Sequence, residues 1–574
     1  MRMTVEVLDE DLPPLAKVQL TTRGCDYTLH AGDLIFWKRD LTEVGNLGNP
    51  NEMDYAAYLL HEKGIRYEQH LPLNQVFNGG SSPTLMNRMA NTRRAIEHMV
   101  FNSGLSQSSQ RFIIALLLGD SHHIDRSTRA EFSSAGIAHV LALSGLHIGI
   151  IALIIWWLLF PLDYIQMKKT RLVVTLLSIA CFALFTGLSS SVIRSAIMIG
   201  FTFMALFFSR RYAPINSLLM SALLIMVFSP ASIFSVGFQL SFITVGTVLI
   251  MSDITTSFNT GSRIIDRFIS IVTTSLVVLI ATLSLTAHYF HTISLASVIS
   301  NLLVLPVLPF FMILGCVFLL ITLAGFRWSM LEQFIDLISD YIHWVAKTVN
   351  DIPFSHAQSV YVSTTGTIIY FIVIILVAVW IYQRNYRYLL AAGCALVILL
   401  GHSLWIDAHT PRRGLVIFNA FTSTPVLYYD HGRGYVWVPD DPDGDITLLS
   451  RFYDGFLSAH GIGEVRLIGN DSTVRLQDAL FKPPHAYLYN HRLAIAGSGK
   501  WKSKSAIGKM KVEEVILSKH YRGSIARLRE LYEFDRIIIS GAMQRSSLMP
   551  LMHECDSLGI TPHVLERDGA YEVQ

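Results

Sequence analysis

The sequence is short of charge and of cysteine, and each shortage limits what the protein can be. Only 15% of its 574 residues are charged, and 52% are hydrophobic. Soluble proteins carry about 25% charged residues, so this chain is too apolar for an ordinary soluble protein, and a membrane core is indicated. The five cysteines are scattered without a CxxC pair, which argues against a disulfide framework and against a zinc site. We expect no metal and no cofactor.

Two further motifs are missing. Residues 1–20 include four carboxylates and no apolar run, so no signal peptide opens the chain. No GxxxxGK[ST] motif is present, so any ATP-driven work must come from a partner. The formal net charge of +2 predicts neither nucleic-acid binding nor its absence.

The apolar residues gather between about Val140 and Ile406. Pro306 and Pro309 predict that one long apolar stretch is a broken or re-entrant helix. Residues 331–349 form an amphipathic pattern typical of a helix on the membrane surface. Candidate membrane spans lie at residues 138–162, 171–188, 192–208, 214–229, 237–252, 268–289, 293–324, 365–382 and 388–406.

Basic residues occupy alternate loops between these spans, which predicts orientation. Such loops face the cytoplasm, so both ends of the chain are expected on the outer side. Since no export signal precedes the first domain, we expect that an upstream membrane segment is missing from the chain. The basic residues are Lys168, Lys169, Arg171, Arg210, Arg211, Arg263, Arg267, Arg384 and Arg387.

The two ends of the chain differ from its middle. Short strand-like runs predict a β-rich domain at residues 1–80, and helical spacing predicts a connector at 81–135. Strands alternating with helices predict an α/β domain at 412–574. The expected fold class is therefore a polytopic α-helical membrane protein, with its transmembrane domain at 136–406, a partial β domain before it and an α/β domain after it.

Polar side chains at the beginning of the first span are the strongest functional signal. His139, Ser144 and His147 are costly in lipid, and on a helix Ser144 and His147 lie about 60° apart. They could line a pore entrance. They could instead form a nucleophilic Ser/His pair with Asp120 as its acid, or they could simply accompany close helix packing at Gly145 and Gly149.

Further polar residues lie within later spans. Arg194 either extends to the interface or contacts a passing phosphate. Gln239 and Ser241 either bond between helices or face a path. His288 and His291 are three apart, as metal ligands can be, but without a carboxylate they form a weak metal signal.

In this order, these stretches closely resemble the competence domain of the ComEC family, whose members conduct the incoming DNA strand across the cytoplasmic membrane during natural transformation. The stretches that carry the resemblance are Leu116–Asp120, Gly136–Gly149 with its Ser-Gly-Leu-His block, Thr186–Ala196, Ser229-Pro230, Gly237–Phe242 and the run of Asn301, Pro306 and Pro309. The path for single-stranded DNA is then expected to include Asp120, His139, Ser144, His147, Arg194, Gln239, Ser241, His291 and Asn301.

The resemblance extends to both ends. Residues 1 to about 73 are similar to the later strands of the family's OB-fold, and such folds bind single strands on aromatic and basic side chains. The candidates are Tyr27, Phe36, Trp37, Lys38 and Arg39, although a role in the barrel core explains them equally well. The tail resembles the family's metallo-β-lactamase-like domain without its HxHxDH run, and Lys519-His-Tyr-Arg-Gly-Ser524 replaces a His-His-Gly-Ser motif. We therefore expect a degenerate, metal-free tail and no enzyme activity.

The resemblance also implies partners and a location. These are single-stranded DNA, the lipid bilayer, a cytoplasmic ATP-driven motor and periplasmic DNA receptors, in the cytoplasmic (inner) membrane of a bacterium. Assembly into a homo-oligomer is left open. Two alternative functions are a membrane transporter of a small anion or lipid, and a membrane-embedded Ser/His hydrolase.

Overall fold

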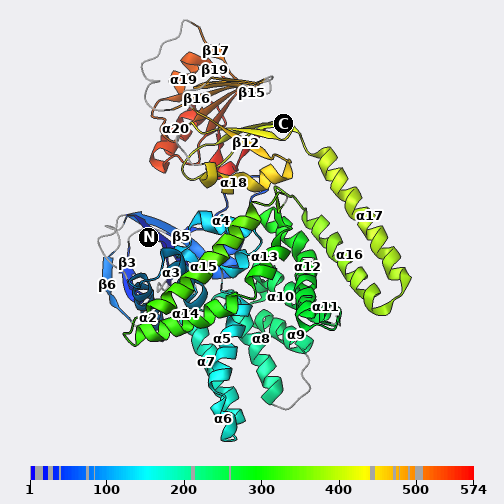
Figure 1. Cartoon of the computed structure of the whole chain (residues 1–574). Coiled ribbons are helices and arrows are strands. Elements are labelled where there is room, and N and C mark those ends of the chain that lie inside the picture. Colours follow the sequence, from blue (N-terminus) through cyan, green and yellow to red (C-terminus); the bar gives the residue numbers. More distant parts are fainter. Residues whose placement is uncertain are drawn as a thin grey trace. The chain divides into compact units, whose positions relative to one another are not determined.

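The structure is a computed structural model, shown in Figure 1, and it divides into two compact units. The N-terminal unit comprises residues 1–44, 56–286 and 292–357, and the C-terminal unit comprises 45–55, 287–291 and 358–574. The described residues are 2–6, 17–23, 30–37, 41–72, 77–82, 84–141, 143–207, 214–256, 260–353, 355–439, 446–469, 473–476, 479–488, 491–497 and 508–573.

The N-terminal unit begins with β structure, as predicted. One sheet has the order β1-β2-β5-β4, with β2 and β5 parallel, and β3 pairs with β6 apart from it. Leu20 and Leu71 form a small core beneath these strands. Closure into an OB barrel stays a prediction. The elements are β1 (Arg2–Glu6), β2 (Lys17–Arg23), β3 (Asp33–Phe36), β4 (Thr42–Glu43), α1 (Tyr55–Tyr58), η1 (Leu59–Lys63), β5 (Ile65–Pro72) and β6 (Phe77–Ser81).

Short helices follow, as the apolar spacing predicts. Thr84 and Ser106 cap the first two, because their hydroxyls accept hydrogen bonds from backbone N–H groups three residues later. Phe112 and Phe132 are completely buried in the largest apolar core of this unit. The elements are α2 (Leu85–Phe101), α3 (Gln107–Ile113), η3 (Ile114–Leu118), η4 (Ser121–His123), α4 (Arg126–Ser134) and η5 (Ala138–Val140).

The apolar middle is helical. Among the described residues, α12, α16 and α17 are each long and apolar enough to cross a membrane, and the pair α13 and α14 adds a fourth span if counted as one. That pair is bent by 46°, which confirms the predicted break at the prolines. The elements are α5 (Gly145–Leu158), α6 (Pro161–Tyr164), α7 (Lys168–Phe185), α8 (Ser190–Phe207), α9 (Pro214–Phe228), η6 (Pro230–Phe234), α10 (Val236–Ile250), α11 (Ser252–Thr256), α12 (Arg263–Phe290), β7 (Thr292–Ser294), α13 (Ser297–Val304), α14 (Leu308–Leu323), α15 (Ser329–Asn350), β8 (His356–Gln358), α16 (Thr364–Gln383) and α17 (Tyr386–His409).

One helix boundary differs from the prediction. The span expected at 138–162 begins only at Gly145, because Ser144 has an extended backbone and caps α5, and His139 lies in the separate turn η5. Our assumption that His139, Ser144 and His147 share one helix was therefore wrong.

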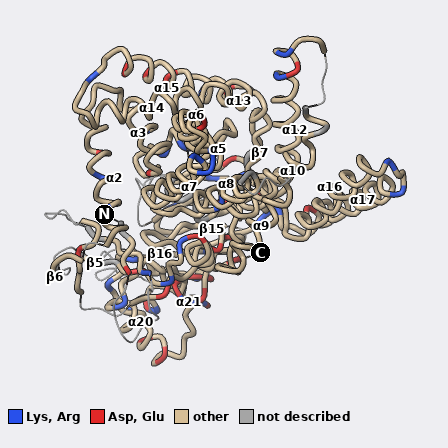
Figure 2. Tube along the Cα trace, turned by 90° about the horizontal axis from the view of Figure 1, so that it is seen from below, with Lys and Arg blue, Asp and Glu red and all other residues tan. Residues whose placement is uncertain are grey.

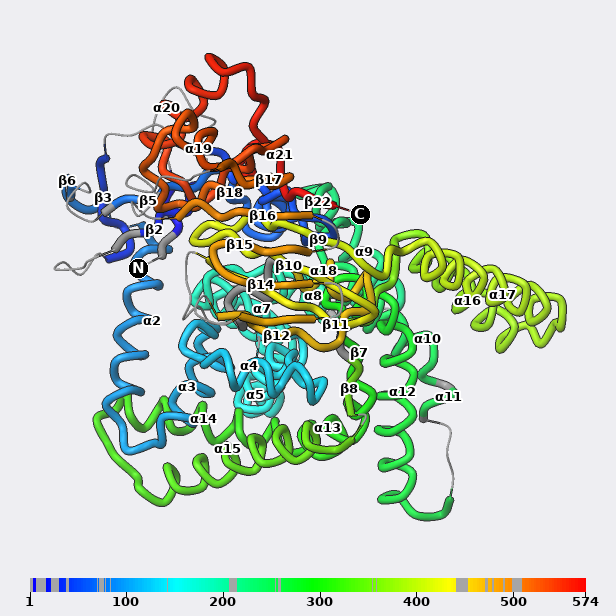
Figure 3. Tube along the Cα trace, turned by 90° about the horizontal axis from the view of Figure 1, so that it is seen from above, coloured from blue at the N-terminus to red at the C-terminus, as the bar shows by residue number. Residues whose placement is uncertain are grey.

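Three helices of the apolar middle show how the distribution of apolar and charged residues along the sequence relates to packing. α15 has the predicted amphipathic periodicity, and it buries Leu331, Ile335 and Ile342 on one face. It runs beside α14 (Figure 3). α16 and α17 form a hairpin, and Figure 2 shows basic residues at its tip, where Arg384 and Arg387 lie, and little charge along its length.

The C-terminal unit contains two sheets that pack face to face. Their strand orders are β12-β11-β10-β9-β22 and β13-β14-β15-β16-β18-β20-β21, with a small β17-β19 pair beside them. The elements are β9 (Arg413–Ile417), β10 (Val426–Asp430), β11 (Arg433–Trp437), α18 (Ile446–Ala459), β12 (Glu464–Ile468), β13 (Val474–Arg475), β14 (Ala479–Lys482), β15 (His485–Leu488), β16 (His491–Ala496), β17 (Met510–Lys511), β18 (Glu514–Leu517), α19 (Ile525–Leu531), β19 (Tyr532–Glu533), β20 (Arg536–Ile539), α20 (Arg545–Ser557), β21 (His563–Val564), α21 (Leu565–Asp568) and β22 (Tyr571–Val573).

The alternation of side chains in these strands explains the layers. Trp437 and Ile516 point into the core between the sheets. Val515 and Leu517, one position away on either side of Ile516, point outward and pack against α19 and α20. On the other sheet, Tyr453 of α18 covers the outer face. The predicted layered α/β pattern is thus an α/β/β/α sandwich.

A short segment from the beginning of the chain is built into this sandwich. Asn49 Nδ2 donates to the Asn419 carbonyl oxygen, and Asn419 N–H donates to Asn49 Oδ1, both at 2.9 Å. Asn419 Nδ2 donates to the Leu47 carbonyl oxygen at 2.8 Å. Both asparagines are buried, so these bonds fix segment 45–55 on the end of β9.

Candidate functional site at the starts of three membrane helices

Ser144 and His147 form a local pair at the start of α5. His147 Nδ1 accepts a hydrogen bond from Ser144 N–H at 2.9 Å and lies 3.0 Å from Ser144 Oγ. His147 is fully buried, and its Nε2 has no hydrogen-bond partner among the described residues. Because Nδ1 accepts from a backbone N–H, the pair has the geometry of a helix cap.

The third residue of a nucleophilic triad is missing from this pair. A base that activates a serine is oriented by an acid on its other ring nitrogen. Asp120, the predicted acid, instead accepts a hydrogen bond from His122 N–H at 2.9 Å. It gathers with Glu97 and His123. The structure therefore pairs Ser144 with His147 but does not bring Asp120 to them.

His139 lies close to the pair from the neighbouring turn η5. It is near enough to His147 for the charges of the two rings to interact. Its side chain is exposed.

The start of α5 lies against α8. A Cβ atom added at Gly145 would be 2.9 Å from Ser195 Oγ, whereas one added at Gly149 would meet nothing within 4 Å. Only Gly145 therefore permits the close helix approach that both glycines suggested. Ser195, which Gly145 approaches, directly follows Arg194 in α8.

Arg194 is the buried cation of this region. It is 5% exposed, and its Nη1 donates to Ser190 Oγ one turn earlier. Its Nε has no hydrogen-bond partner among the described residues. Arg194 is thus buried among the helices of the described part of the N-terminal unit.

The start of α10 faces this arginine. A Cβ atom at Gly237 would lie 3.1 Å from both Arg194 Nη2 and Glu62 Oε1. Gly237 N–H donates to Glu62 Oε1 at 3.2 Å. Glu62, from η1 of the β-rich region, therefore places its carboxylate on a helix start beside a guanidinium.

We call Glu62, Ser144, His147, Ser190, Arg194 and Gly237 the helix-start cluster. Free N–H groups and the helix dipole give the N-terminal end of a helix a partial positive charge. The early turns of α5, α8 and α10 meet here, and Arg194 adds a full positive charge. Such an arrangement can bind an anion. The Glu62 carboxylate occupies the position that a phosphate oxygen could take.

The remaining path candidates lie elsewhere. Gln239 Nε2 donates to the Ile233 carbonyl oxygen at 3.0 Å, a local contact between α10 and η6, and Ser241, two residues further along α10, is half-buried. Asn301 Oδ1 and His291 Nδ1 are buried without hydrogen bonds among the described residues. The structure does not bring these four residues into the helix-start cluster.

The predicted DNA-binding side chains of the β-rich region are only partly described. Phe36 is 61% exposed and covers Gly79, and Trp37 is half-buried beside the small core. Tyr27, Lys38 and Arg39 lie outside the described residues.

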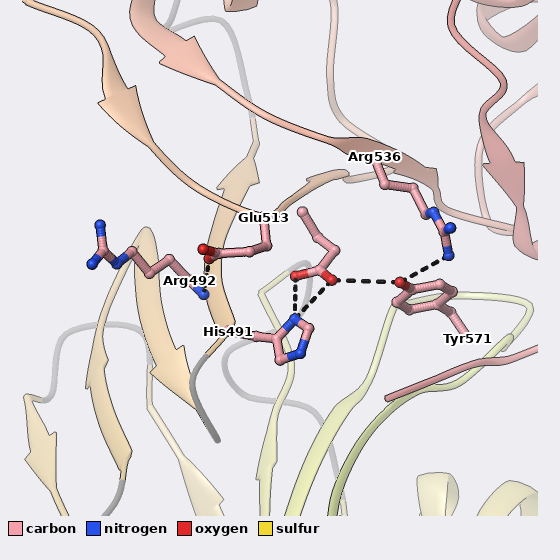
Figure 4. Close-up of polar contacts among 6 residues, drawn as sticks. His491, Arg492, Glu513, Arg536 and Tyr571 are labelled. Atoms are coloured by element: carbon pink, nitrogen blue, oxygen red, sulfur yellow. Dashed lines mark hydrogen bonds and ion pairs between the residues drawn. The ribbon is translucent and has the colours of Figure 1, made fainter. Parts of the chain in front are cut away.

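A second polar network lies in the C-terminal unit (Figure 4). The buried Glu514 carboxylate contacts His491 Nδ1 at 3.0 Å and accepts from Tyr571 OH at 3.4 Å. Arg536 Nη1 donates to Tyr571 OH at 3.0 Å, and Arg492 N–H donates to Glu513 at 2.6 Å. Burial raises the pKa of Glu514 above its usual range, and the His491 ring opposes that shift. These residues hold the ends of strands together.

The remnant of the family motif in the tail has a structural role. Ser524 Oγ accepts a hydrogen bond from Arg527 N–H at 3.2 Å and so caps α19, while His520 is exposed. Among the described residues of the C-terminal unit, no three metal-binding side chains come together. That the tail binds no metal stays a prediction.

Sequence reasoning missed Glu62 and Glu97. Both are acidic residues on helical segments, where a charge is ordinarily taken as solvated. Glu62 lies within residues 1 to about 73, which resemble the later strands of the family's OB-fold. Nothing in the pattern indicated its contact with α10.

Comparison with known proteins gives the context for this site. A family model described as "Competence protein" matches residues 116–384, which include the helix-start cluster except Glu62. A second model, "ComEC C-terminal domain", matches residues 415–574. No solved structure matches the chain.

One curated relative also matches. This is ComE operon protein 3 of Bacillus subtilis (strain 168), which is 24% identical over 369 residues. The match covers 63% of this chain and 46% of the relative. The chain thus matches less than half of that protein's length.

Proposed function

Because the chain belongs to the ComEC family of competence proteins, we propose that its membrane helices conduct single-stranded DNA across the cytoplasmic membrane during natural transformation. The observation that carries this proposal is the helix-start cluster. It offers one buried guanidinium and three helix starts to an anion, in the part of the chain that matches the competence family model.

The small number of fixed charges suits conduction. DNA carries one negative charge per nucleotide, so a site that bound phosphates tightly would hold the strand. In the cluster, Arg194 is balanced by Glu62, which already occupies the α10 start. A passing phosphate would replace the Glu62 carboxylate, contact Arg194 and the N–H of Gly237, and be displaced again.

The other path residues would act as neutral polar contacts. His139, Ser144 and His147 would line the entrance, and Asp120, Gln239, Ser241, His291 and Asn301 would follow along the strand. The β-rich region would bind the arriving strand as an OB-like fold, with the exposed ring of Phe36 available for stacking on a base.

The tail would be a degenerate metallo-β-lactamase-like domain. Its layered α/β structure agrees with that assignment, and Ser524 serves as a helix cap. We propose that it has no nuclease activity, and that the chain is not an enzyme. Among the described residues, His147 Nε2 has no hydrogen-bond partner and so no orienting acid of the kind that a Ser/His hydrolase needs, which supports this view.

The proposed setting is the inner membrane of a bacterium, with both ends of the chain on the outer side. Periplasmic receptors would deliver the strand, and a cytoplasmic ATP-driven motor would pull it. A homo-oligomer is compatible with this arrangement.

The test is uptake of labelled DNA. The gene is deleted in its competent host, and DNA that becomes nuclease-resistant inside the cell is measured after re-expression of the chain or a variant. Loss of a hydrogen bond to a charged group costs about 1.5–3 kcal/mol, so Arg194→Gln should lower uptake about 10-fold or more. Arg387→Gln, a change of the same kind at an exposed position in the first turn of α17, should import DNA like the wild type.

A second variant tests the balance of charge. Glu62→Gln keeps the shape but leaves Arg194 without its balancing charge, so it should hold phosphates more tightly and import DNA more slowly than the wild type. All variants are compared at equal amounts in the membrane by immunoblot. Normal uptake by correctly inserted Arg194→Gln would refute the role of the cluster. Unchanged uptake after deletion would refute DNA conduction and favour a transporter of a small anion or lipid.

A further inference from the structure

Three side chains that could bind a metal gather outside the helix-start cluster. Glu97 lies on α2, Asp120 follows η3, and His123 ends η4. One carboxylate oxygen of each acid and one ring nitrogen of His123 lie within 4.8 Å of one another. Donor atoms that bind one ion at about 2.1 Å in a tetrahedral site lie about 3.4 Å apart, so the side chains would have to approach one another by up to about 1.4 Å to complete a site.

The three side chains are held in place by their surroundings. The Asp120 carboxylate accepts from His122 N–H, which fixes it at the start of η4. The ring of His123 packs edge-on against Phe101, at 5.0 Å between centroids. Glu97 is on the buried side of α2, whereas Asp120 is half-buried and His123 is exposed. The group therefore lies at the protein surface with the Glu97 carboxylate beneath it.

A second observation points to a missing ligand. Glu97 is only 8% exposed, and its Oε1 has no hydrogen-bond partner among the described residues. Arg93 Nε forms an ion pair with this oxygen at 3.5 Å, but the two atoms form no hydrogen bond. Buried carboxylate oxygens are normally hydrogen-bonded, because leaving one unsatisfied costs about 1–3 kcal/mol or more. Burial, and then the charge of Asp120, raise the pKa of Glu97.

We propose that Glu97, Asp120 and His123 bind one divalent transition-metal ion, of the Mn²⁺ or Zn²⁺ type. One imidazole and two carboxylates form a ligand set that suits these ions. The ion would satisfy Glu97 Oε1 and offset the two like charges. This departs from our expectation of no metal, which rested on cysteine spacing and on the tail. The proposal does not depend on DNA conduction.

The neighbourhood gives the ion a structural consequence. Arg93, one turn before Glu97, donates from Nη1 to the Thr186 carbonyl oxygen at 3.3 Å. A Cβ atom at Gly119 would lie 3.3 Å from Thr186 Cβ. Thr186, in the loop between α7 and α8, therefore contacts both α2, which carries Glu97, and the residue before Asp120. An ion that joins α2 to η4 would hold this loop, and with it the beginning of α8.

The test is Mn²⁺ binding by the purified full chain in nanodiscs after treatment with EDTA. Free Mn²⁺ is followed by electron paramagnetic resonance, with Zn²⁺ as competitor. We expect one saturable Mn²⁺ per chain. Since each change removes a ligand, Glu97→Gln and His123→Gln should each weaken binding about 10-fold or more. His122→Gln changes the adjacent, exposed histidine outside the group and should bind like the wild type.

A spectroscopic readout separates direct ligation from a general loss of structure. Bound Mn²⁺ should show electron spin echo modulation from a coordinated imidazole nitrogen in the wild type and in His122→Gln. This signal should be absent from residual ion in His123→Gln. The proposal is overturned if the wild type binds no Mn²⁺ saturably, or if Glu97→Gln and His123→Gln bind it with wild-type affinity and signal.

Discussion

The asparagine pair of the C-terminal unit allows the sharpest prediction of stability. Asn49→Ala removes the side chain that bonds both the N–H and the carbonyl group of Asn419. Both residues are buried, at 7% and 4% exposed, so water cannot readily replace these bonds. The substitution leaves two buried backbone groups unsatisfied. We therefore expect the end of β9 to open locally far more often.

The size of this effect follows from the cost of unsatisfied groups. Each costs about 1–3 kcal/mol, and because adjacent groups are not additive we expect about 2–4 kcal/mol in total. Since every 1.4 kcal/mol is about a factor of ten, the amide hydrogen of Asn419 should exchange about 30- to 700-fold faster. The effect should fade along β9 toward Arg413.

Hydrogen–deuterium exchange of the full chain, read from peptides that cover residues 413–420, measures this opening. Asn46→Ala is the matched control, because Asn46 is exposed and bonds Asp54 at the surface, and its removal should change exchange about twofold at most. If Asn419 exchanged at the same rate in Asn49→Ala and Asn46→Ala, the docking of segment 45–55 through these bonds would be refuted.

Three other outcomes are expected. Gly541→Ala should lower stability by about 1–3 kcal/mol in chemical denaturation, because its Cβ would lie 2.0 Å from Asn419 Oδ1, whereas Gly463→Ala, with open space around it, should change stability by about 0.5 kcal/mol at most. Burial raises the pKa of the Cys555 thiol to about 11, so only about 0.1% is thiolate at pH 8. Iodoacetamide labelling of Cys555 in the folded chain, read by mass spectrometry, should be very slow at pH 8 and rise about tenfold by pH 9. Rapid labelling at pH 8 would contradict this burial. Ser144→Ala should import DNA within about twofold of the wild type, because Ser144 acts as a helix cap; complete loss of uptake by an inserted variant would favour the hydrolase.

Local patterns in the sequence predicted the local structure well. The turn Asp430-His-Gly-Arg433 forms a hairpin between β10 and β11, since His431 and Gly432 both adopt the positive φ angles that such turns require. Pro306 and Pro309 break the long apolar stretch because proline supplies no N–H to the helix. Both signals depend on residues near in sequence, and a single chain is enough to read them.

Long-range contacts of charged residues were not predictable in this way. Glu62 and Gly237 are 175 positions apart, and no periodicity links them. The same holds for Glu97, whose burial depends on which face of α2 packs inward. His139 shows a related limit. Ser144 caps α5, so His139 lies in the separate turn η5, and the average hydrophobicity of a stretch of sequence does not reveal such a cap.

The contacts of Asn49 and Glu62 illustrate the same limit. Asn49 forms buried hydrogen bonds with Asn419 after β9, and Glu62 accepts a hydrogen bond from Gly237 at the start of α10. The two residues of each pair are 370 and 175 positions apart, so neither contact follows from a local pattern. Such contacts depend on how the whole chain folds, because a residue's partner is then set by packing and not by its neighbours in sequence.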